Sequence, residues 1–412
     1  MAAAHVSNWD YRVLDGSPLS VTTAFPSRDG VVWYSALSAI EDLAPHWQVL
    51  EQACPERFGY FQSFDWCRAW ARGFLSGPDA LGEMRLLALW REGRIALLWP
   101  AMVSSAPMGV RVLSALGEPH TQYNSVLYDP ALVNVGTAHQ FRAELQSAAG
   151  FDLVNLASVP AGSWLDRTIA DFSTAAPGSN ETAFFDLASI DDLEQYNASL
   201  SGTLRRKRKE RRRRMARAGN IGFQVFWPHQ AEFARLISDC VVWKRRWLSE
   251  TGRYSQGFSI EGYERFLSQL TGNCGSRSGA VLFVLDIDGA PAAAELGFIH
   301  RNDFYAYIGG FDWDYRQLSP GKVLMEMVIE WLHAAGVARY DLLGNPAEYK
   351  STWSNTTVAL TGYVLPVSLR GRIYAYGWLN HMRPGLKKVY DAIPPSVRRA
   401  VLSSRLVRRG GK

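Results

Sequence analysis

The stretch that decides the fold runs from Phe304 to Lys350 and reads FYAYIGGFDWDYRQLSPGKVLMEMVIEWLHAAGVARYDLLGNPAEYK. Phe304 to Ile308 is aromatic and β-branched, which predicts a strand. Gly309-Gly310 follows this strand and favours a bulge or the close approach of another backbone. Ser319-Pro320-Gly321 then predicts a helix start, with Ser319 as N-cap residue and Pro320 at the first helical position. Apolar residues recur at helical spacing until Gly336 ends the helix.

The start of this helix is a candidate anion-binding site. Backbone N–H groups in the first turn of a helix lack intrahelical acceptors, and they suit a pyrophosphate. Gly321, Lys322 and Val323 would supply these groups, while Lys322 or Arg316 would add positive charge. The alternative is an ordinary capped helix with cations at the surface. The glycine pair at residues 309 and 310, just before the helix, favours the binding site.

The same residues resemble a known family. Tyr-Arg…Ser-Pro-Gly-x-x-Leu stands at residues 315–324, and Tyr-Asp-Leu-Leu-Gly…Glu-Tyr-Lys-x-x-Trp stands at residues 340–353 after the helix. This pattern is similar to the CelD-like acetyltransferases, which belong to the GCN5-related N-acetyltransferase (GNAT) superfamily and are relatives of the FemAB peptidoglycan-bridge enzymes. The family usually has a second glycine after Leu-Gly, whereas this chain has Asn345-Pro346. The turn after Gly344 therefore departs from the family pattern.

The resemblance extends over about residues 55 to 365. Phe61-Gln62-Ser63, the segment ending at Trp99-Pro100 and residues 113–117 resemble the family's N-terminal half. The arginine-rich helix from Leu204, ending at Gly219, resembles the segment that opens the second half. The resemblance implies an α+β fold of two tandem GNAT-like domains with mixed, mostly antiparallel sheets, followed here by a basic helical C-terminal tail.

The resemblance also implies an activity. An N-acyltransferase of this kind moves an acyl group from acyl-CoA, or from an acyl carrier thioester, to an amine of a sugar, a cell-envelope precursor or a peptide. Acyl-CoA is then the co-substrate, and no metal is needed. The donor would lie in the C-terminal half, where backbone near Ile308, Gly309 and Gly310 would hold the thioester. Its pyrophosphate would lie at the helix start that Ser319 caps.

Two carboxylates are candidates for the base that deprotonates the amine. Glu295 stands among small apolar residues in a predicted strand from Ala292 to His300, and burial there would raise its pKa. Strand alternation equally allows Glu295 to face outward. Asp341 ends the predicted strand after the helix, where GNAT sheets line the acceptor pocket. The alternative for Asp341 is a turn cap.

Three further candidates lie in a predicted short helix near residue 348. A lysine in this neighbourhood contacts the phosphate of the acceptor in FemAB-like relatives, so the resemblance alone makes Lys350 and its neighbour Glu348 candidates for substrate binding. Tyr349 is a candidate acid for the leaving thiolate. The competing interpretation is that Tyr349 packs on Trp353 and that Lys350 is solvated.

Charge is unevenly distributed along the chain, whose formal net charge is +5. Leu204 to Arg217 holds ten Lys and Arg and one Glu, and Pro366 to Lys412 holds eleven Lys and Arg and one Asp. The remainder is therefore net negative, and two basic elements on an acidic body indicate an anionic partner. The basic helix lacks interleaved aromatic residues, so a solvated or phosphate-facing helix is favoured over nucleic-acid binding.

The order of predicted elements gives four regions. Residues 1–35 form an N-terminal extension, 36–190 an N-terminal GNAT-like domain, 191–365 a C-terminal GNAT domain with the acyl-donor site, and 366–412 the basic tail. A Gly-, Ser- and Pro-rich stretch at residues 158–180 is the expected linker. No run of apolar residues is long enough for a transmembrane helix. The N-terminus lacks signal-peptide features, and the four cysteines lack metal-ligand spacing.

Two other functions remain open. A FemAB-like transferase would use aminoacyl-tRNA, with the basic helix as its tRNA surface. A non-catalytic scaffold would serve polysaccharide or lipid assembly at a membrane. In all cases the expected location is the cytoplasm, with attachment at the inner membrane as an option, since short amphipathic helices of the tail could rest on anionic lipid.

Overall fold

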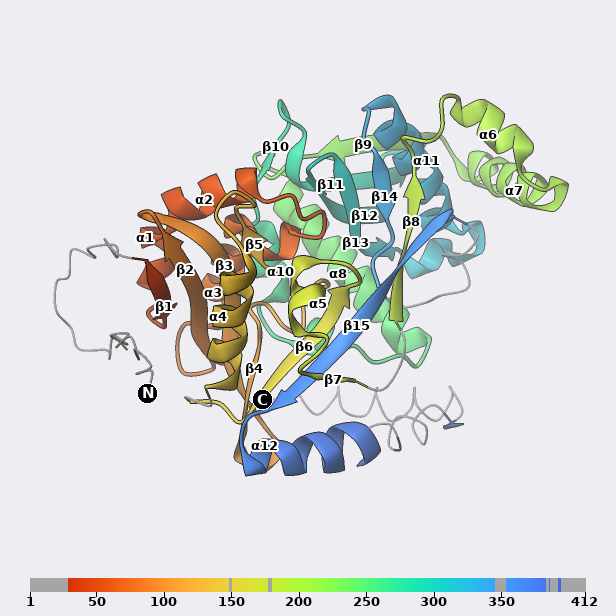
Figure 1. The fold of residues 1–412 in the computed structure, drawn as a ribbon. Coiled ribbons are helices and arrows are strands. Elements are labelled where there is room, and N and C mark those ends of the chain that lie inside the picture. Colours follow the sequence, from red (N-terminus) through yellow and green to blue (C-terminus); the bar gives the residue numbers. More distant parts are fainter. Residues whose placement is uncertain are drawn as a thin grey trace, which may run out of the picture. The chain divides into compact units, whose positions relative to one another are not determined.

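A computed structural model of the chain describes residues 29–147, 150–176, 180–344, 353–382, 385 and 392–393. The chain divides into two compact units (Figure 1). Unit 1 comprises Met1–Ala175 and Tyr363–Arg372, and unit 2 comprises Ala176–Gly362 and Ile373–Lys412. Each unit is therefore made from two separate segments of the sequence.

Unit 1 is built on a mixed sheet. Four strands pair antiparallel in chain order, and a fifth, β6, lies parallel to β4: β1 (Gly30–Tyr34), β2 (Glu83–Arg91), β3 (Arg94–Ala106), β4 (Val110–Ala115) and β6 (Leu153–Pro160). Short strands β5 (Leu127–Tyr128) and β7 (Thr174–Ala175) pair at its margins. Its helices are α1 (Ser38–Asp42), α2 (Ala44–Ala53), α3 (Phe64–Phe74), α4 (Val135–Gln146) and α5 (Trp164–Ile169). Its core is rich in tryptophan, including fully buried Trp47, Trp66, Trp70, Trp90 and Trp99.

Unit 2 repeats this pairing order. Its antiparallel strands are β9 (Ile221–Phe226), β11 (Ser278–Ile287), β12 (Ala290–His300) and β13 (Asp303–Phe311), and β14 (Arg339–Asp341) lies parallel to β13. Beyond β14 come β8 (Asn180–Asp186) and β15 (Thr356–Pro366), both antiparallel to their neighbours. In both units an antiparallel set leads through a helix to a parallel strand. The expected mixed α+β class is confirmed.

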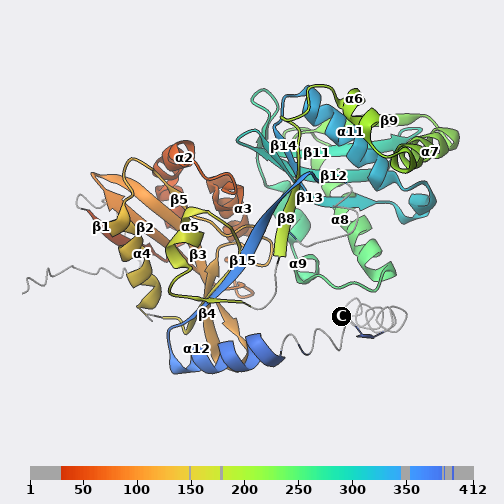
Figure 2. The same ribbon diagram turned by 45° about the vertical axis from the view of Figure 1, so that its right-hand side comes forward.

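The helices of unit 2 cover two faces of its sheet (Figure 2). On one face α11 (Pro320–Ala334) packs against β11, β12 and β13, and Trp331 lies edge-on to Phe283 with ring centroids 5.1 Å apart. On the other face α8 (Phe233–Glu250) packs on β12 and β13. The other helices are α6 (Leu193–Ser199), α7 (Gly202–Ala218), α9 (Gln256–Ser259) and α10 (Tyr263–Ser268). Packing on both faces holds β13 and the start of α11 in place, and these two elements form the candidate site described below.

Strand β15 passes from one unit into the other. Its residues Thr356–Leu360 pair with β8 in unit 2, whereas Tyr363 and Val364 pair with β7 in unit 1. A short helix α12 (Leu369–Ile373) and a π-helix (Tyr374–Met382) follow, so the described part of the expected tail is helical. None of the helices in the described residues is long and apolar enough to cross a membrane.

Some local features differ from what the sequence predicts. The arginine-rich helix expected from Leu204 to Gly219 is α7, and a separate helix, α6, precedes it, because Ser201 adopts an extended conformation and caps α7 by accepting from the Leu204 amide at 3.3 Å. The stretch at 158–180, which remains the predicted linker, contains helix α5 with buried Trp164 and Leu165, and the division between the two units falls within it, after Ala175. Strand β8 was missed, although Ala183, Phe184 and Phe185 form a short apolar run.

Candidate functional site

The parallel strands β13 and β14 separate soon after they meet. They pair only from Asp303 with Arg339 to Tyr305 with Asp341, and β13 then continues to Phe311. Among the described residues, no strand therefore pairs with β13 on the β14 side beyond Tyr305. The N–H and C=O groups on that side of β13 can pair with an extended ligand, as an exposed strand edge does.

A bulge lies at this point of β13. Leu296 of β12 pairs with Ile308, and the next residue, Gly297, pairs with Ala306, so Tyr307 is the extra residue. A bulge redirects the backbone groups beside it and is common next to active sites. The Tyr307 hydroxyl accepts a hydrogen bond from Tyr263 at 3.1 Å, which fixes the bulged residue on the α10 side of the strand.

The two glycines after the bulge have different surroundings. A Cβ atom on Gly309 would meet no atom within 4 Å, and Gly309 is exposed. A Cβ atom on Gly310 would collide with the carbonyl oxygen of Cys240 in α8. Gly310 is therefore required by helix packing, while Gly309 leaves open space beside the strand.

The helix start lies directly after β13. A 3₁₀ helix (Trp313–Leu318) leads to Ser319, which has φ +57° and ψ +50°, a left-handed conformation that costs energy in a residue other than glycine. Ser319 is the N-cap residue of α11, as expected, but it does not cap the helix through its side chain. Instead its carbonyl oxygen accepts from the amides of Lys322 at 3.1 Å and Val323 at 3.4 Å, and its side chain makes no capping bond.

The predicted donor-site residues lie around this turn. Lys322 and Arg316 are exposed, and the Arg316 guanidinium lies 5.8 Å from the ring centroid of Trp313 and donates to the Trp313 carbonyl at 3.1 Å. Val323 is 3% exposed and its side chain belongs to the core, so only its backbone faces the turn. A Cβ atom on Gly321 would lie 3.7 Å from Phe311, which places Gly321 beside the end of β13.

Glu295 is buried, so the interpretation in which it faces solvent is wrong. It is 6% exposed on β12, opposite Gly309, and it accepts a hydrogen bond from the Tyr340 hydroxyl at 2.6 Å. Burial raises the pKa of Glu295 to about 7, and the hydrogen bond from Tyr340 opposes the rise. A carboxyl group with this pKa changes charge near neutral pH.

Asp341 is also buried but has a different environment. Its Oδ1 accepts from the Thr182 hydroxyl on β8 and from the Leu343 amide, each at 2.8 Å. Leu343 has φ +60°, so these bonds hold an unusual turn at the end of β14. Asp341 thus has the geometry of a turn-stabilising residue.

The third group of candidates falls outside the described residues. Glu348, Tyr349 and Lys350 lie between Gly344 and Trp353, where no placement is described. Within the described ranges, no cluster of three or more His, Cys, Asp or Glu side chains could hold a metal ion. Two residues of this site were not among the predicted ones: Tyr340, which donates to Glu295, and Thr182, which donates to Asp341. Tyr340 could have been found, because it directly precedes Asp341 in the family pattern.

Part of unit 2 is similar in sequence to a known domain family. The model of the acetyltransferase (GNAT) domain matches residues 202–351. We found no match among curated proteins. The structure resembles FemX with a TM-score of 0.54 at 10% identity, covering 81% of this chain and 98% of FemX. It also resembles the C-terminal domain of a putative lysylphosphatidylglycerol synthetase from Agrobacterium fabrum, with a TM-score of 0.52 at 14% identity, covering 83% and 95% of the two chains.

These two likenesses show a shared fold. The family match covers the bulged strand β13, the strained turn at Ser319 and the helix α11, which are the elements of the site described above. GNAT domains in general transfer an acyl group from acyl-CoA to an amine. The part of the chain from residue 202 to residue 351 is thus similar to acetyltransferase (GNAT) domains in sequence.

Proposed function

We propose that this protein is a tandem GNAT N-acyltransferase in which unit 2 binds acyl-CoA and transfers its acyl group to an amine. The observation that carries the proposal is the separation of β13 from β14 beside the start of α11. The edge of β13 offers backbone N–H and C=O groups to the extended arm of a thioester. The start of α11 offers backbone amides to a pyrophosphate. Both lie within about fifteen residues of sequence.

The donor would bind along this path. Its pyrophosphate would lie at Gly321 and Lys322, with Arg316 adding charge, and its pantetheine arm would follow the edge of β13 past Ile308 and Gly309. The left-handed turn at Ser319 supports this assignment, because strained backbone persists mainly where a function requires it. Gly310 would contribute indirectly, since it allows α8 to approach the strand.

Glu295 is our candidate for the general base. In the proposed step it accepts a proton from the acceptor ammonium, directly or through a water molecule, and the neutral amine attacks the thioester carbonyl. A C–N bond forms and the C–S bond breaks. The nitrogen releases its second proton to solvent as the amide forms. The departing CoA thiolate takes up a proton, for which Tyr349 is the candidate donor, and Tyr349 regains its own proton from solvent. A pKa of about 7 suits a base that works near neutral pH.

The acceptor would be an amine of a sugar, a cell-envelope precursor or a peptide, contacted by Lys350 and Glu348. This assignment rests on the family resemblance. The fold shared with FemX and with a putative lysylphosphatidylglycerol synthetase domain supports an acceptor from the cell envelope. We place the reaction in the cytoplasm, with attachment at the inner membrane as the option to test.

Isothermal titration with acetyl-CoA, longer acyl-CoAs and free CoA tests the donor site. We expect binding by the parent protein and loss of binding in Gly321→Trp, because the indole would fill the space at the helix start. Ala334→Trp is the matched control, since it adds the same side chain at an exposed position of the same helix. Failure of every thioester to bind the parent, or equal binding by both variants, would contradict the proposal.

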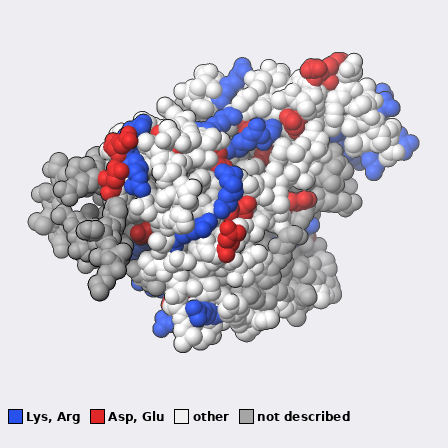
Figure 3. All heavy atoms as spheres, in the orientation of Figure 1, with Lys and Arg blue, Asp and Glu red and all other residues white. Residues whose placement is uncertain are grey.

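The second candidate is a FemAB-like transferase that uses aminoacyl-tRNA. It is favoured by the basic residues of α7, which gather where Figure 3 shows blue spheres at the right-hand edge. Filter binding to charged tRNA over a range of salt concentrations separates the two functions. Contacts to several phosphates would make affinity fall steeply with salt. Turnover with acyl-CoA and no tRNA binding would reject this candidate.

A further inference from the structure

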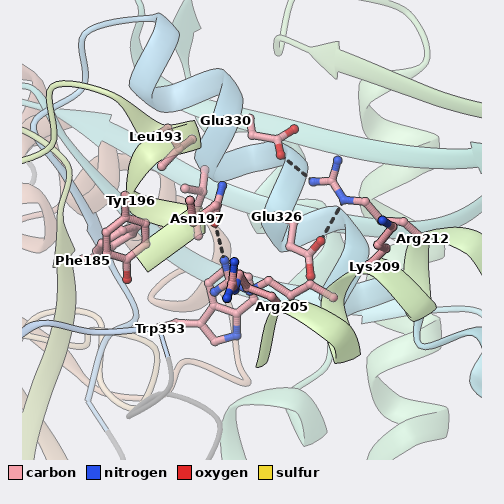
Figure 4. A pocket seen from close by; sticks show the side chains of 13 residues that line it. Phe185, Leu193, Tyr196, Asn197, Arg205, Lys209, Arg212, Glu326, Glu330 and Trp353 are labelled. Carbon is pink, nitrogen blue, oxygen red and sulfur yellow. Dashed lines mark hydrogen bonds and ion pairs between the residues drawn. The ribbon is translucent and has the colours of Figure 1, made fainter. Parts of the chain in front are cut away.

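A pocket of about 330 Å³ lies in unit 2 among α6, α7 and the second half of α11 (Figure 4). Its size is at the lower end of the range for small-molecule sites. Its lining has two distinct walls. The apolar wall consists of Phe185, Leu193, Tyr196 and Ile329. The basic wall consists of Arg205, Arg208, Lys209 and Arg212.

The basic wall is one face of helix α7. Arg205 lies three and four residues before Arg208 and Lys209, and Arg212 lies four and three residues after them, which brings the side chains to the same side of the helix. Other basic residues of α7, such as Arg206 and Arg213, are exposed and do not line the pocket. The helix therefore has a pocket-facing set of cations and a separate outward-facing set.

The carboxylates of the pocket already have partners. Glu326 is 5% exposed and accepts from Arg211 and from the Nε of Arg212, each at 2.9 Å. Glu330 accepts from the Nη2 of Arg212 at 2.5 Å. Figure 4 shows Arg212 reaching both carboxylates. Within the described residues, neither glutamate forms an ion pair with Arg205, Arg208 or Lys209.

Arg208 is the most constrained of these cations. Its guanidinium lies 3.8 Å from the ring centroid of Trp353, and its Nη1 donates to Asn197 Oδ1 at 2.7 Å. Its buried Nε has no hydrogen-bond partner among the described residues. Burial lowers the pKa of Arg208, because a cation loses hydration there. Arg205 and Lys209 have no recorded ion pair within the described part of the chain.

We propose that this pocket binds a soluble phosphate monoester. The phosphate would lie against Arg205, Arg208 and Lys209, because guanidinium groups match phosphate geometry and a dianion offsets several unpaired cations. The apolar part of the ligand would lie on Phe185 and Tyr196, whose ring centroids are 5.0 Å apart. This site is separate from the donor site, and the proposal does not depend on the acyl-transfer function.

Calorimetric titration of the full chain with inorganic phosphate and with phenyl phosphate tests the proposal. We expect both to bind and phenyl phosphate to bind more tightly, because only it can contact the apolar wall. Arg205→Gln with Lys209→Gln should weaken binding by about tenfold or more, as expected for loss of charge-assisted hydrogen bonds. Both side chains are exposed, so folding should be retained.

Arg206→Gln with Arg213→Gln is the matched control, since it removes the same charge from the outward side of α7. We expect it to change affinity by less than about twofold at physiological salt, where long-range effects are screened. If both double variants lose the same affinity for the phosphate ester, binding depends on general charge and not on the pocket, and the proposal is overturned. No binding to the parent at millimolar phosphate ester, or equal affinity for the two probes, would also overturn it.

Two further experiments distinguish a soluble phosphate monoester from CoA and from a phospholipid. Saturating free CoA should leave phenyl phosphate binding unchanged; competition would assign the pocket to the donor site and overturn a separate site. Vesicles containing phosphatidic acid test a lipid source of the same phosphate group. In one outcome the parent pellets with these vesicles and fails to bind soluble esters, and the Arg205→Gln, Lys209→Gln variant no longer pellets. That result would overturn the choice of a soluble ligand.

Discussion

At the scale of single residues, Glu295 and Asp341 differ in what holds them. Glu295 has one hydrogen-bond donor recorded, the Tyr340 hydroxyl, and lies opposite the open space at Gly309. Asp341 accepts from a hydroxyl and from the amide of a strained turn. A group that must exchange protons needs room and a shifted pKa, whereas a group that fixes a turn needs saturated hydrogen bonds. Glu295 meets the first description and Asp341 the second.

Glu295→Gln should therefore lower turnover with acetyl-CoA by about 10²–10⁴-fold, the usual effect of removing a general base. In the parent, log kcat/KM should rise with pH and level off above about pH 7, because the base must be deprotonated. The variant should lose this rise. Asp341→Asn should leave the profile in place and lower stability instead. Parental turnover by Glu295→Gln across the pH range would reject Glu295 as the base.

The same carboxyl group should affect stability. Its folded pKa of about 7 lies above the usual glutamate pKa of 4.5, so the folded state binds more protons between these pH values. The free energy of unfolding should then fall as pH rises from about 4.5 to 7, by about 3 kcal/mol at most, and stay level above. Glu295→Gln should lack this fall. Urea unfolding of both proteins at several pH values measures the difference, and parallel curves would contradict it.

Sequence reasoning located Glu295 but not its orientation. Its neighbours Ala293 and Ala294 are small and apolar, so alternation gives no contrast between the two faces of the strand. The register of β12 with β13 decides the question, and a bulge at Tyr307 shifts that register. Such a shift is a tertiary feature that a single sequence does not encode locally. Tyr349, Lys350 and Glu348 remain predictions.

At the scale of elements, the end of β13 is shaped by what packs on it. Gly309 and Gly310 are adjacent, yet α8 approaches the backbone only at Gly310, where the Cys240 carbonyl occupies the place of a Cβ atom. The sequence predicted that both glycines bind the donor. The structure gives Gly310 a packing role that depends on a helix about seventy residues earlier.

Alanine at the two positions should separate packing from binding. Gly310→Ala should lower the free energy of unfolding by about 1–3 kcal/mol, because α8 or β13 must move. Gly309→Ala should leave stability within about 1 kcal/mol, and any effect should appear as weaker acyl-CoA binding. Thermal unfolding and calorimetry on the two variants measure both quantities. Equal destabilisation would show that both glycines are needed for packing.

Long elements with strong patterns were predictable, whereas short or context-dependent ones were not. The helix α11 begins at Pro320 because Ser-Pro-Gly has both turn and helix-start propensity. Strand β8 was missed because three apolar residues without flanking signals also fit a loop or a helix. Its identity as a strand comes from pairing with β14 and β15, which lie about 160 or more residues later.

At the scale of the whole molecule, the two units share one chain in an interleaved way. Residues 363–372 belong to unit 1 although unit 2 precedes them. The sequence suggested domains in simple succession, because composition and periodicity report neighbours along the chain and not returns to an earlier unit. Specific contacts hold residues 363–372 in unit 1. One of them is the hydrogen bond that the Ser368 hydroxyl donates to Asp152 at 2.6 Å.

This return segment should be necessary for the stability of unit 1. Tyr363 is 7% exposed and donates to Asp166, Val364 is 5% exposed, and Gly371 lies against the Asp152 carbonyl. Burial of two apolar side chains and these hydrogen bonds are together worth about 5 kcal/mol, comparable to the net stability of a domain. A chain that ends after Gly362 should therefore expose most of β4 and β6.

A chain that ends after Arg372 is the matched control, because it lacks the same later residues but keeps the ten that complete unit 1. Hydrogen exchange followed by mass spectrometry measures protection in β4 and β6 of both chains. We expect strong protection in the longer chain and near-complete exchange in the shorter one, since opening of a destabilised unit exposes all its amides together. Equal protection would mean that unit 1 folds from residues before Ala176 alone, and that β15 joins a core that is already complete.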